Sequence, residues 1–430
     1  MRTYIKNGRV INPATKQDAI LDIAIENERI VEVGMDLISR GNLAGAEIID
    51  AEGCMIMPGF VDLHVHFRDP GLTYKEDIET GAKAAARGGV TTVCAMPNTK
   101  PVVDSVETLE YIQNKAERTA PIHVEQLSAV TKGQNGTELV DMKAMVEQGA
   151  IGFSEDGKSV MDVTLYAEAM KQAAELGAVV MAHCEDKALV RGGVLNEGIA
   201  SKRFGVPGIT NSVEDIITAR DIFLANDCGT KLHLCHCSTA GSVELVRMAK
   251  KMGISVTAEV CPHHFTLCDA DIDCEDSNYK MNPPLRSEAD VQALIRGLQD
   301  GTMEVISTDH APHSAEEKAK GFLEAPFGIV GLETSASLTY TALVATGILT
   351  PMQMAEKMSW NPAKVIGIEE ERGSIEAGKL ADIVIFNPDM EYEVDVNEFA
   401  SKGKNTPFAG KLLKGRVVKT ICRGKIVFAL

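Results

Sequence analysis

Two histidines and an arginine lie within five residues of one another in the segment PGFVDLHVHFRDPG, residues 58–71. His64 and His66 alternate with Val65 in an apolar run, so in a strand both imidazoles would share one face and Val65 would take the other. Two imidazoles on one face supply half of a metal site. An H-x-H pair alone fits two buried core histidines equally well, so the rest of the chain must distinguish the two interpretations.

The elements that could bring further ligands to this pair lie in the middle of the chain. Eight strand-like apolar runs alternate there with helix-length segments, which is typical of repeated βα units and a parallel sheet. Some of these segments end at glycine, as in DVTLYAEAMKQAAELG at 162–177. Eight units in one run favour a (β/α)8 TIM-like barrel within the α/β class. The expected strands are 59–67, 90–96, 122–130, 150–156, 178–184, 231–237, 254–260 and 304–310.

The two chain ends have a different pattern. Residues 1–55 contain short alternating runs separated by Gly, Asn and Pro, which indicates antiparallel strands. A piece of this length buries little surface alone, and residues 366–430 contain matching material such as GKLADIVIFNPD. We therefore expect one small β-sandwich domain formed from both termini, with the barrel at 56–365.

Polar residues gather at the carboxyl ends of the expected strands, where barrels of this type keep their catalytic residues. Histidines packed for structural reasons alone would have no reason to recur at this position. Four imidazoles and two carboxylates suit zinc and related divalent ions, and they exceed what one tetrahedral centre needs. The pattern therefore favours a site for two ions. The six candidate ligands are His64, His66, Asp156, His183, His236 and Asp309.

The run KLHLCHC at 231–237 contains two histidines, which strand alternation separates. It places His236 on the face of Leu232 and Leu234, and it turns His233 toward the helices. We therefore predict a structural role for His233. The remaining histidines expected to be structural or to face away from the site are His123, His263, His264 and His310.

The ordered motifs of the chain resemble those of class I dihydroorotases in the amidohydrolase superfamily. They are PGFVDLHVHFRDPG, AMPNT, SEDG, AHCED, HLCHCS, CPHHFTL, NPPLR and STDHAPH, and GSIEAGKLADIVIFNPD extends the similarity into the small domain. The resemblance implies a zinc-dependent hydrolase acting on cyclic amides. Its reaction would be the reversible cyclisation of N-carbamoyl-L-aspartate to L-dihydroorotate in pyrimidine (UMP) biosynthesis.

The resemblance also assigns roles to the candidate ligands. It implies two zinc ions bridged by Asp156 and a hydroxide, with His64, His66 and Asp309 on one ion and His183 and His236 on the other. Asp309 would also act as general base and then as general acid. Many relatives bridge their metals with a carboxylated lysine instead. Here the SEDG motif supplies Asp156, and Lys158 is expected at the surface.

Substrate recognition should follow the single carboxylate of dihydroorotate. Arg68 can hold a carboxylate through two parallel hydrogen bonds, which lysine cannot reproduce. The resemblance implies that Asn98 and His313 contact the same carboxylate. It assigns the ring amides to Asn282 and to the backbone around Phe327 and Gly328. Taken singly, each asparagine could equally be a turn or cap residue.

Composition excludes several classes of partner. The chain has 43 Lys plus Arg against 61 Asp plus Glu, a net charge of -18, which disfavours nucleic acid. We find no apolar run long enough for a membrane span and no secretory signal in the first residues. The 10 cysteines form no C-x-x-C framework, which is typical of reduced thiols. We expect a soluble, cytoplasmic protein that takes a small-molecule substrate.

Two alternative functions are open at this point. The first is another cyclic amidohydrolase, such as an allantoinase or a hydantoinase; the combination of Arg68, Asn98 and His313 with Asp156 argues against it. The second is a non-catalytic dihydroorotase-like partner of aspartate transcarbamoylase, and the presence of all six candidate ligands argues against that. The resemblance suggests a homodimer and leaves transcarbamoylase binding open.

Overall fold

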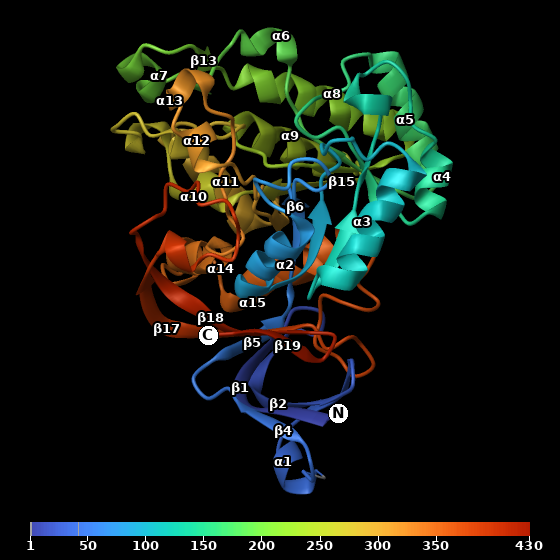
Figure 1. Ribbon diagram of the computed structural model, residues 1–430, viewed down its shortest axis with the longest axis vertical. Helices are drawn as coiled ribbons and strands as arrows, with labels where there is room; N and C mark the ends of the chain where they lie inside the picture. The colour runs from blue at the N-terminus through green and yellow to red at the C-terminus, as the bar shows by residue number, and fades with distance from the viewer. Residues whose placement is uncertain (1, 42) are drawn as a thin grey trace.

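The computed structural model describes residues 2–41 and 43–430. The molecule is elongated, with a small β part at one end that holds both chain termini (Figure 1). The larger part consists of parallel strands surrounded by helices. In the described part of the chain, no helix is long and apolar enough to cross a membrane.

The small part is one eight-stranded sheet to which both ends of the chain contribute. Its strand order is β19-β18-β17-β5-β1-β2-β3, with β4 paired to β1. The antiparallel pairing of β5 with β17, in which Pro58 faces Ile383, joins the two ends. A separate cluster of buried isoleucines packs on this sheet. The strands are β1 (Arg2–Asn12), β2 (Gln17–Glu26), β3 (Arg29–Gly34), β4 (Glu47–Asp50), β5 (Met55–Pro58), β17 (Ile383–Glu393), β18 (Leu412–Cys422) and β19 (Lys425–Ala429).

Most strands of the larger part form two parallel sheets, and the short parallel pair β12-β13 is separate from them. One has the order β6-β7-β8 and the other β16-β15-β14-β11-β10-β9. The strands are β6 (Phe60–Val65), β7 (Val90–Ala95), β8 (His123–Gln126), β9 (Ser128–Ala129), β10 (Gly152–Ser154), β11 (Val179–Ala182), β14 (Lys231–Leu234), β15 (Val256–Val260) and β16 (Val305–Ile306). Each expected strand segment therefore contains observed strand, over fewer residues than predicted.

The two parallel sheets meet along both edges. Val65, at the end of β6, forms a parallel bridge with His310, and the His66 N–H donates to the His310 carbonyl at 2.8 Å. On the other side only Leu127 separates β8 from β9, and its N–H donates to Ala95 of β7 at 3.1 Å. Backbone bonds thus continue from each sheet to the next.

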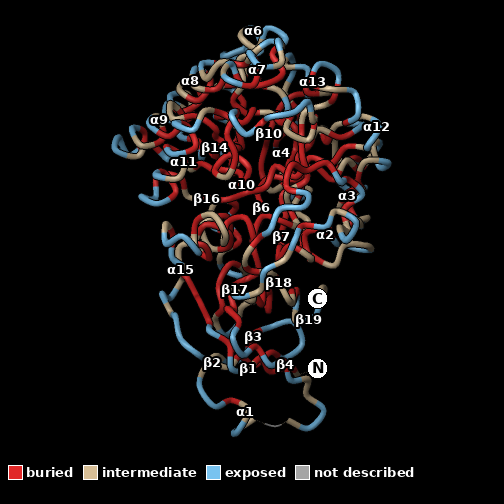
Figure 2. Tube along the Cα trace, turned by 90° about the vertical axis from the view of Figure 1, so that its left-hand side faces the viewer, coloured by how far each residue is buried: buried red, intermediate tan, exposed pale blue. Residues whose placement is uncertain are grey.

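The helices that follow the strands begin at side-chain caps and bury apolar faces. Asp77 accepts a hydrogen bond from the Thr80 N–H at 2.9 Å and starts α2, as N-cap carboxylates do. Val65 and Leu232 belong to the helix-facing core, whereas Leu63 belongs to the core inside the strands. Figure 2 shows this buried interior, and each fully buried aliphatic side chain in it contributes roughly 1.5–3 kcal/mol. The main helices are α2 (Ile78–Arg87), α3 (Val106–Thr119), α4 (Met142–Glu147), α5 (Val163–Glu175), α8 (Ser212–Cys228), α9 (Ala240–Lys251) and α11 (Glu288–Asp300).

Short elements cover the end of the strands that points away from the small sheet (Figure 1). The segment 310–332 contains α12 (Ala315–Lys318) and α13 (Gly321–Glu324). The region around 187–209 contains α6 (Lys187–Val190), β12 (Leu195–Asn196), α7 (Ile199–Phe204) and β13 (Gly208–Ile209). The remaining α-helices are α1 (Leu37–Arg40), α10 (Pro262–Thr266), α14 (Ser335–Thr339), α15 (Pro351–Ala355) and α16 (Asn361–Val365).

Candidate metal centre

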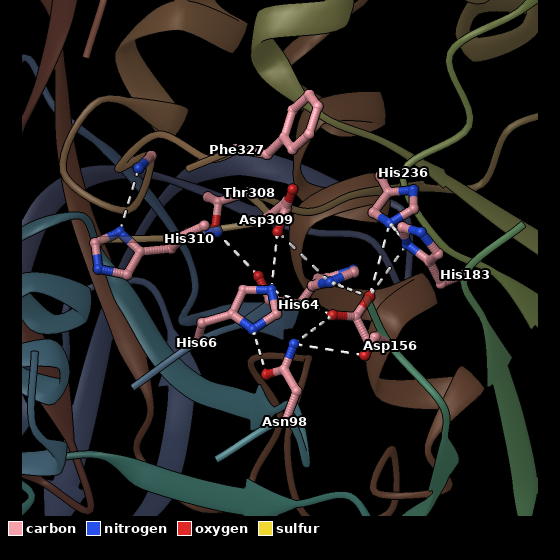
Figure 3. A network of polar contacts seen from close by, with 12 residues as sticks. His64, His66, Asn98, Asp156, His183, His236, Thr308, Asp309, His310 and Phe327 are labelled. Atoms are coloured by element: carbon pink, nitrogen blue, oxygen red, sulfur yellow. Dashed lines mark hydrogen bonds and ion pairs between the residues drawn. The ribbon is translucent and has the colours of Figure 1, made fainter. Parts of the chain in front are cut away.

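A cleft of about 180 Å³ opens at the carboxyl ends of the parallel strands. The six predicted ligands converge at its floor, and all are buried (Figure 3). His64 lies deepest, with no exposed surface, and the other five line the cleft. The further lining residues are Arg68, Asn98, Gly157, Asn282, Ala311, Phe327 and Gly328.

The first group of ligands comes from the end of β6 and the segment after β16. His64 Nε2 lies 3.2 Å from Asp156 Oδ1 and 3.6 Å from Asp309 Oδ1. His66 Nε2 lies 3.1 Å from Asp309 Oδ1 and 3.5 Å from Asp156 Oδ2. Two imidazole nitrogens and two carboxylates therefore surround one point, as a divalent cation requires.

The second group contains His183 and His236, which follow β11 and β14. His183 Nδ1 lies 2.8 Å from His236 Nε2. The same two nitrogens are 3.5 Å and 3.7 Å from Asp156 Oδ1. Asp156 is therefore the one carboxylate common to both groups, which is the geometry expected of a bridging ligand. The assignment of these six side chains as metal ligands stays a prediction.

The polar atoms of this cluster lack partners that a cation would supply. Three buried atoms, His64 Nε2, Asp156 Oδ1 and His183 Nε2, have no hydrogen-bond partner among the described residues. Orphaned buried polar atoms are costly and rare, and they often mark an ion or water site. The donor set of imidazoles and carboxylates suits zinc, so the residues fit such an ion.

Charge in the cluster is also unbalanced without a cation. Burial would lower the pKa of His64, but the Asp156 carboxylate outweighs it and raises that pKa well above its ordinary value. Burial likewise opposes the rise at His183, where Asp156 and Glu185 bring the pKa to about 10. The two buried carboxylates thus favour positive charge at this position.

Two residues, Asn98 and Glu259, form hydrogen bonds with the candidate ligands, and these contacts were not predicted from the sequence. The Asn98 carbonyl lies 2.9 Å from His66 Nδ1, and its amide donates to Asp156 Oδ2 at 3.1 Å. Asn98 thus contacts two candidate ligands in addition to lining the cleft. Glu259 of β15 lies 2.8 Å from His64 Nδ1. The sequence contains one indication of this role, because Glu259 is a charged residue inside the apolar run VTAEVC.

The wall of the cleft carries one cation without a carboxylate partner. Arg68 is half-buried, and its Nε donates to the Pro312 carbonyl at 3.3 Å. Among the described residues, no carboxylate forms an ion pair with its guanidinium, and burial lowers its pKa. Unneutralised buried charge is costly, so this position favours an anionic ligand.

The other predicted substrate contacts differ in how much of their polar surface is free. His313 is buried behind Arg68 and outside the cleft lining, and its Nε2 lies 2.8 Å from the Phe327 carbonyl. Burial and nearby Arg68 lower the His313 pKa to about 2, which keeps its ring neutral. The Asn282 amide donates to the Glu185 carboxylate. The Gly328 N–H donates to Lys280, and its carbonyl accepts from Lys318 and Asn405.

The predicted orientation of His233 is wrong. Its Nε2 lies 3.1 Å from Glu259 Oε2, the carboxylate that also contacts His64, whereas Leu232 and Leu234 pack in the helix-facing core. Strand β14 ends at Leu234, and His236 has a φ of +33°. Strand alternation therefore cannot be carried from Leu234 to His236, which reaches the cleft through a change of backbone direction.

Lys158 was expected at the surface, and four histidines were expected to be structural or to face away from the site. Lys158 is half-buried, and its Nζ donates to the Gln134 carbonyl at 2.8 Å. Its ammonium group is therefore engaged by a backbone carbonyl. The histidines His123, His263, His264 and His310 are all buried.

Comparison with known proteins gives the family of the chain. Residues 53–242 match a family model described as Dihydro-orotase-like, and residues 344–428 match the Amidohydrolase family. Among solved structures, L-hydantoinase (dihydropyrimidinase) from Arthrobacter aurescens has a TM-score of 0.90 at 26% identity, covering 100% of this chain and 97% of that one. D-hydantoinase (dihydropyrimidinase) from Thermus sp. has a TM-score of 0.86 at 27% identity, covering 100% and 96%.

Curated relatives match over their full lengths. Dihydroorotase of Pelotomaculum thermopropionicum is 48% identical over 427 residues, which cover 99% of this chain and 98% of that protein. Dihydroorotase of Clostridium acetobutylicum is 49% identical over 424 residues, covering 99% of each. The chain therefore belongs to the dihydroorotase family of the amidohydrolases.

Proposed function

We propose that this chain is a metal-dependent dihydroorotase that interconverts L-dihydroorotate and N-carbamoyl-L-aspartate. The observation that carries the proposal is the Arg68 guanidinium. It stands at the wall of the cleft without an ion-pair partner among the described residues, beside a cluster of histidines and carboxylates. A cyclic amide bearing one carboxylate would neutralise Arg68 while its scissile bond lies over the cluster.

We propose zinc as the metal, with two ions held by the two ligand groups and by Asp156 between them. When bound, such ions polarise the scissile carbonyl and lower the pKa of water. The chain supplies the fixed ligand positions through the ends of five strands and the segments that follow them. It also supplies Asn98, whose two hydrogen bonds keep His66 and Asp156 in place.

Asp309 is our candidate for the group that moves the proton. Burial would raise its pKa, but His64 and His66 outweigh it and bring the pKa to about 2, so the carboxylate is ionised at neutral pH. It lines the cleft and can accept the proton of the attacking water. It then delivers that proton to the leaving ring nitrogen. In the reverse direction the same group allows ring closure, which takes up one proton and is favoured at lower pH.

The remaining contacts orient the ring. Arg68 would bind the substrate carboxylate through its terminal nitrogens, because its Nε is already used by Pro312. Nη2 lies 3.4 Å from His313 Nε2 and keeps a second N–H for the substrate. Gly328 has both backbone groups occupied, so the Phe327 carbonyl, which keeps one free lone pair, is the better candidate for a ring N–H. Asn282 keeps its side-chain carbonyl for the other edge of the ring.

The nearest rival is an enzyme for uncharged cyclic ureides, such as a hydantoinase, because proteins of that name share the fold. Metal analysis combined with hydrolysis of dihydroorotate, hydantoin and dihydrouracil separates the two. We expect two ions per chain and turnover of dihydroorotate far above that of the uncharged rings. Preference for an uncharged ring would refute the proposal.

We also infer that the two parallel sheets form one (β/α)8 barrel and that the small sheet is the β-sandwich domain predicted from the sequence. The bridge from Val65 to His310 supports closure of the barrel. A homodimer, a cytoplasmic location and binding to aspartate transcarbamoylase rest on the family resemblance. Light scattering of the purified chain, alone and with the transcarbamoylase, tests the assembly states.

A further inference from the structure

Glu259, on β15, is a fully buried carboxylate that contacts three histidines. One of its oxygens, Oε1, lies 2.8 Å from His64 Nδ1 and accepts the His236 backbone N–H at 3.0 Å. The other, Oε2, lies 3.1 Å from His233 Nε2. We propose that Glu259 is a positioning residue that fixes one ligand of each proposed ion through a single oxygen atom. This inference rests on the proposed metal centre.

The contact with His64 determines which ring nitrogen faces the centre. An ionised carboxylate only accepts hydrogen bonds, so His64 Nδ1 carries the proton toward Glu259. The Nε2 lone pair then points at Asp156 and Asp309, 3.2 Å and 3.6 Å away. Carboxylates behind metal-binding histidines act in this way to fix the tautomer and raise ligand basicity.

The contact with His236 holds a backbone that would otherwise relax. His236 has a φ of +33°, in the left-handed region that costs a non-glycine residue energy. Its N–H is held by Glu259 Oε1, and its side chain then lies beside His183. A shift of Glu259 would therefore move a residue of the second ligand group as well as turn His64 of the first.

His233 and Thr257 fix Glu259 from the side opposite to the cleft. Because His233 Nε2–H donates to Glu259, its Nδ1 is free to accept the Thr257 hydroxyl proton at 2.8 Å. His233 is fully buried and its two ring nitrogens are both used. These contacts, from Thr257 through His233 to Glu259, hold the carboxylate in one orientation. They also give a role to His233, which contacts none of the candidate ligands' side chains.

The direct test is Glu259→Gln, which keeps the size of the side chain but removes its charge and one acceptor oxygen. Zinc affinity is measured by competition with a chromophoric chelator, and the visible spectrum is recorded after loading with cobalt(II). We expect both ions to bind about 10–100-fold more weakly and the cobalt spectrum to change. Unchanged affinities and an unchanged spectrum would overturn the proposal, and weakening of one ion alone would overturn the shared role.

The matched control is Asp382→Asn, because Asp382 is also buried and pairs with a histidine, His123, at 3.0 Å outside the cleft. This variant should lower the unfolding temperature and leave both zinc affinities unchanged. If Glu259→Gln does not fold, Thr257→Val can be used instead, because it removes the hydroxyl that contacts His233. It should lower the affinity for both ions, by a smaller factor than Glu259→Gln. A wild-type chain that binds no zinc would overturn the metal centre itself, whereas normal zinc binding by Glu259→Gln would overturn this inference alone.

Discussion

Replacing Arg68 by methionine should separate binding of the substrate carboxylate from the chemistry of the ring. The side chain lines the cleft, and its Nε is engaged by the Pro312 carbonyl. Nη2 also lies 3.4 Å from His313 Nε2, and the terminal nitrogens keep further N–H groups for a substrate anion. Methionine fills similar volume and offers no donor, so the change removes the charge and both terminal hydrogen bonds together.

The expected loss follows from the number of hydrogen bonds. Each hydrogen bond to a charged group contributes about 1.5–3 kcal/mol, and a bidentate pair doubles that. Because Arg68 is only half-buried, we take the low end, about 3–4 kcal/mol, which corresponds to roughly 200–1000-fold in kcat/KM for dihydroorotate. Lysine keeps the charge and one bond, so Arg68→Lys should lose about 10-fold.

The assay compares dihydroorotate with dihydrouracil, which has the same ring and no carboxylate. Turnover of dihydrouracil should change by less than about threefold in either Arg68 variant, because the missing carboxylate makes no bond to lose. Arg220→Met is the matched control, since Arg220 pairs with Asp221 outside the cleft lining. Equal losses on both substrates in Arg68→Met, at unchanged metal content, would refute the assignment of Arg68 to the carboxylate.

Three further predictions concern the proton, the metal and stability. Asp309→Asn should keep at least one zinc ion but lower turnover in both directions by at least about 100-fold; near-normal rates would exclude Asp309 as the base. Zinc binding at about pH 7.5 should release protons, since the carboxylates raise the pKa values of His64 and His183 without metal; calorimetry in two buffers measures this, and zero release would contradict it. Burial lowers the Lys357 pKa to about 8 from 10.5, so the unfolded chain binds more protons between these values and stability rises with pH there. Lys357→Met should abolish that rise. It should also increase the free energy of unfolding at pH 7 by about 1–2 kcal/mol, a net gain that allows for the lost hydrogen bond to the Met303 carbonyl. Urea unfolding at pH 7 and at a pH between the two pKa values would measure both effects.

The candidate ligands could be found from the sequence because two simple regularities apply to them. Alternation puts His64 and His66 on one face, and the structure has both near Asp309 while Val65 packs toward the helices. Parallel strands bring their carboxyl ends together, so ligands far apart in the chain could be expected at one place. Neither step requires knowledge of loops or side-chain packing.

The residues around the ligands could not be placed in this way. Asn98 follows a strand in a turn, and nothing in MPNT says that its amide bonds His66 and Asp156. The short segment β12 and helix α7 depend on Asp269, which bonds the Asn196 side chain and the Ile199 N–H across more than sixty intervening positions. Such contacts are tertiary, so local pattern carries no information about them.

The wrong orientation predicted for His233 shows that strand alternation cannot be extended past the ends of the strands, where the residues of the cleft lie. Arg68, His236 and Asp309 have φ values of +60°, +33° and +49°, in a region that non-glycine residues rarely adopt. Each such residue costs roughly 1–3 kcal/mol, and each turns a side chain out of strand alternation and into the cleft. Glycine would relieve this strain at all three positions but would remove the cation, the imidazole or the carboxylate. The chain therefore gives up stability at the positions where its strands end. Prediction by alternation fails there because the backbone has left the strand geometry on which alternation depends.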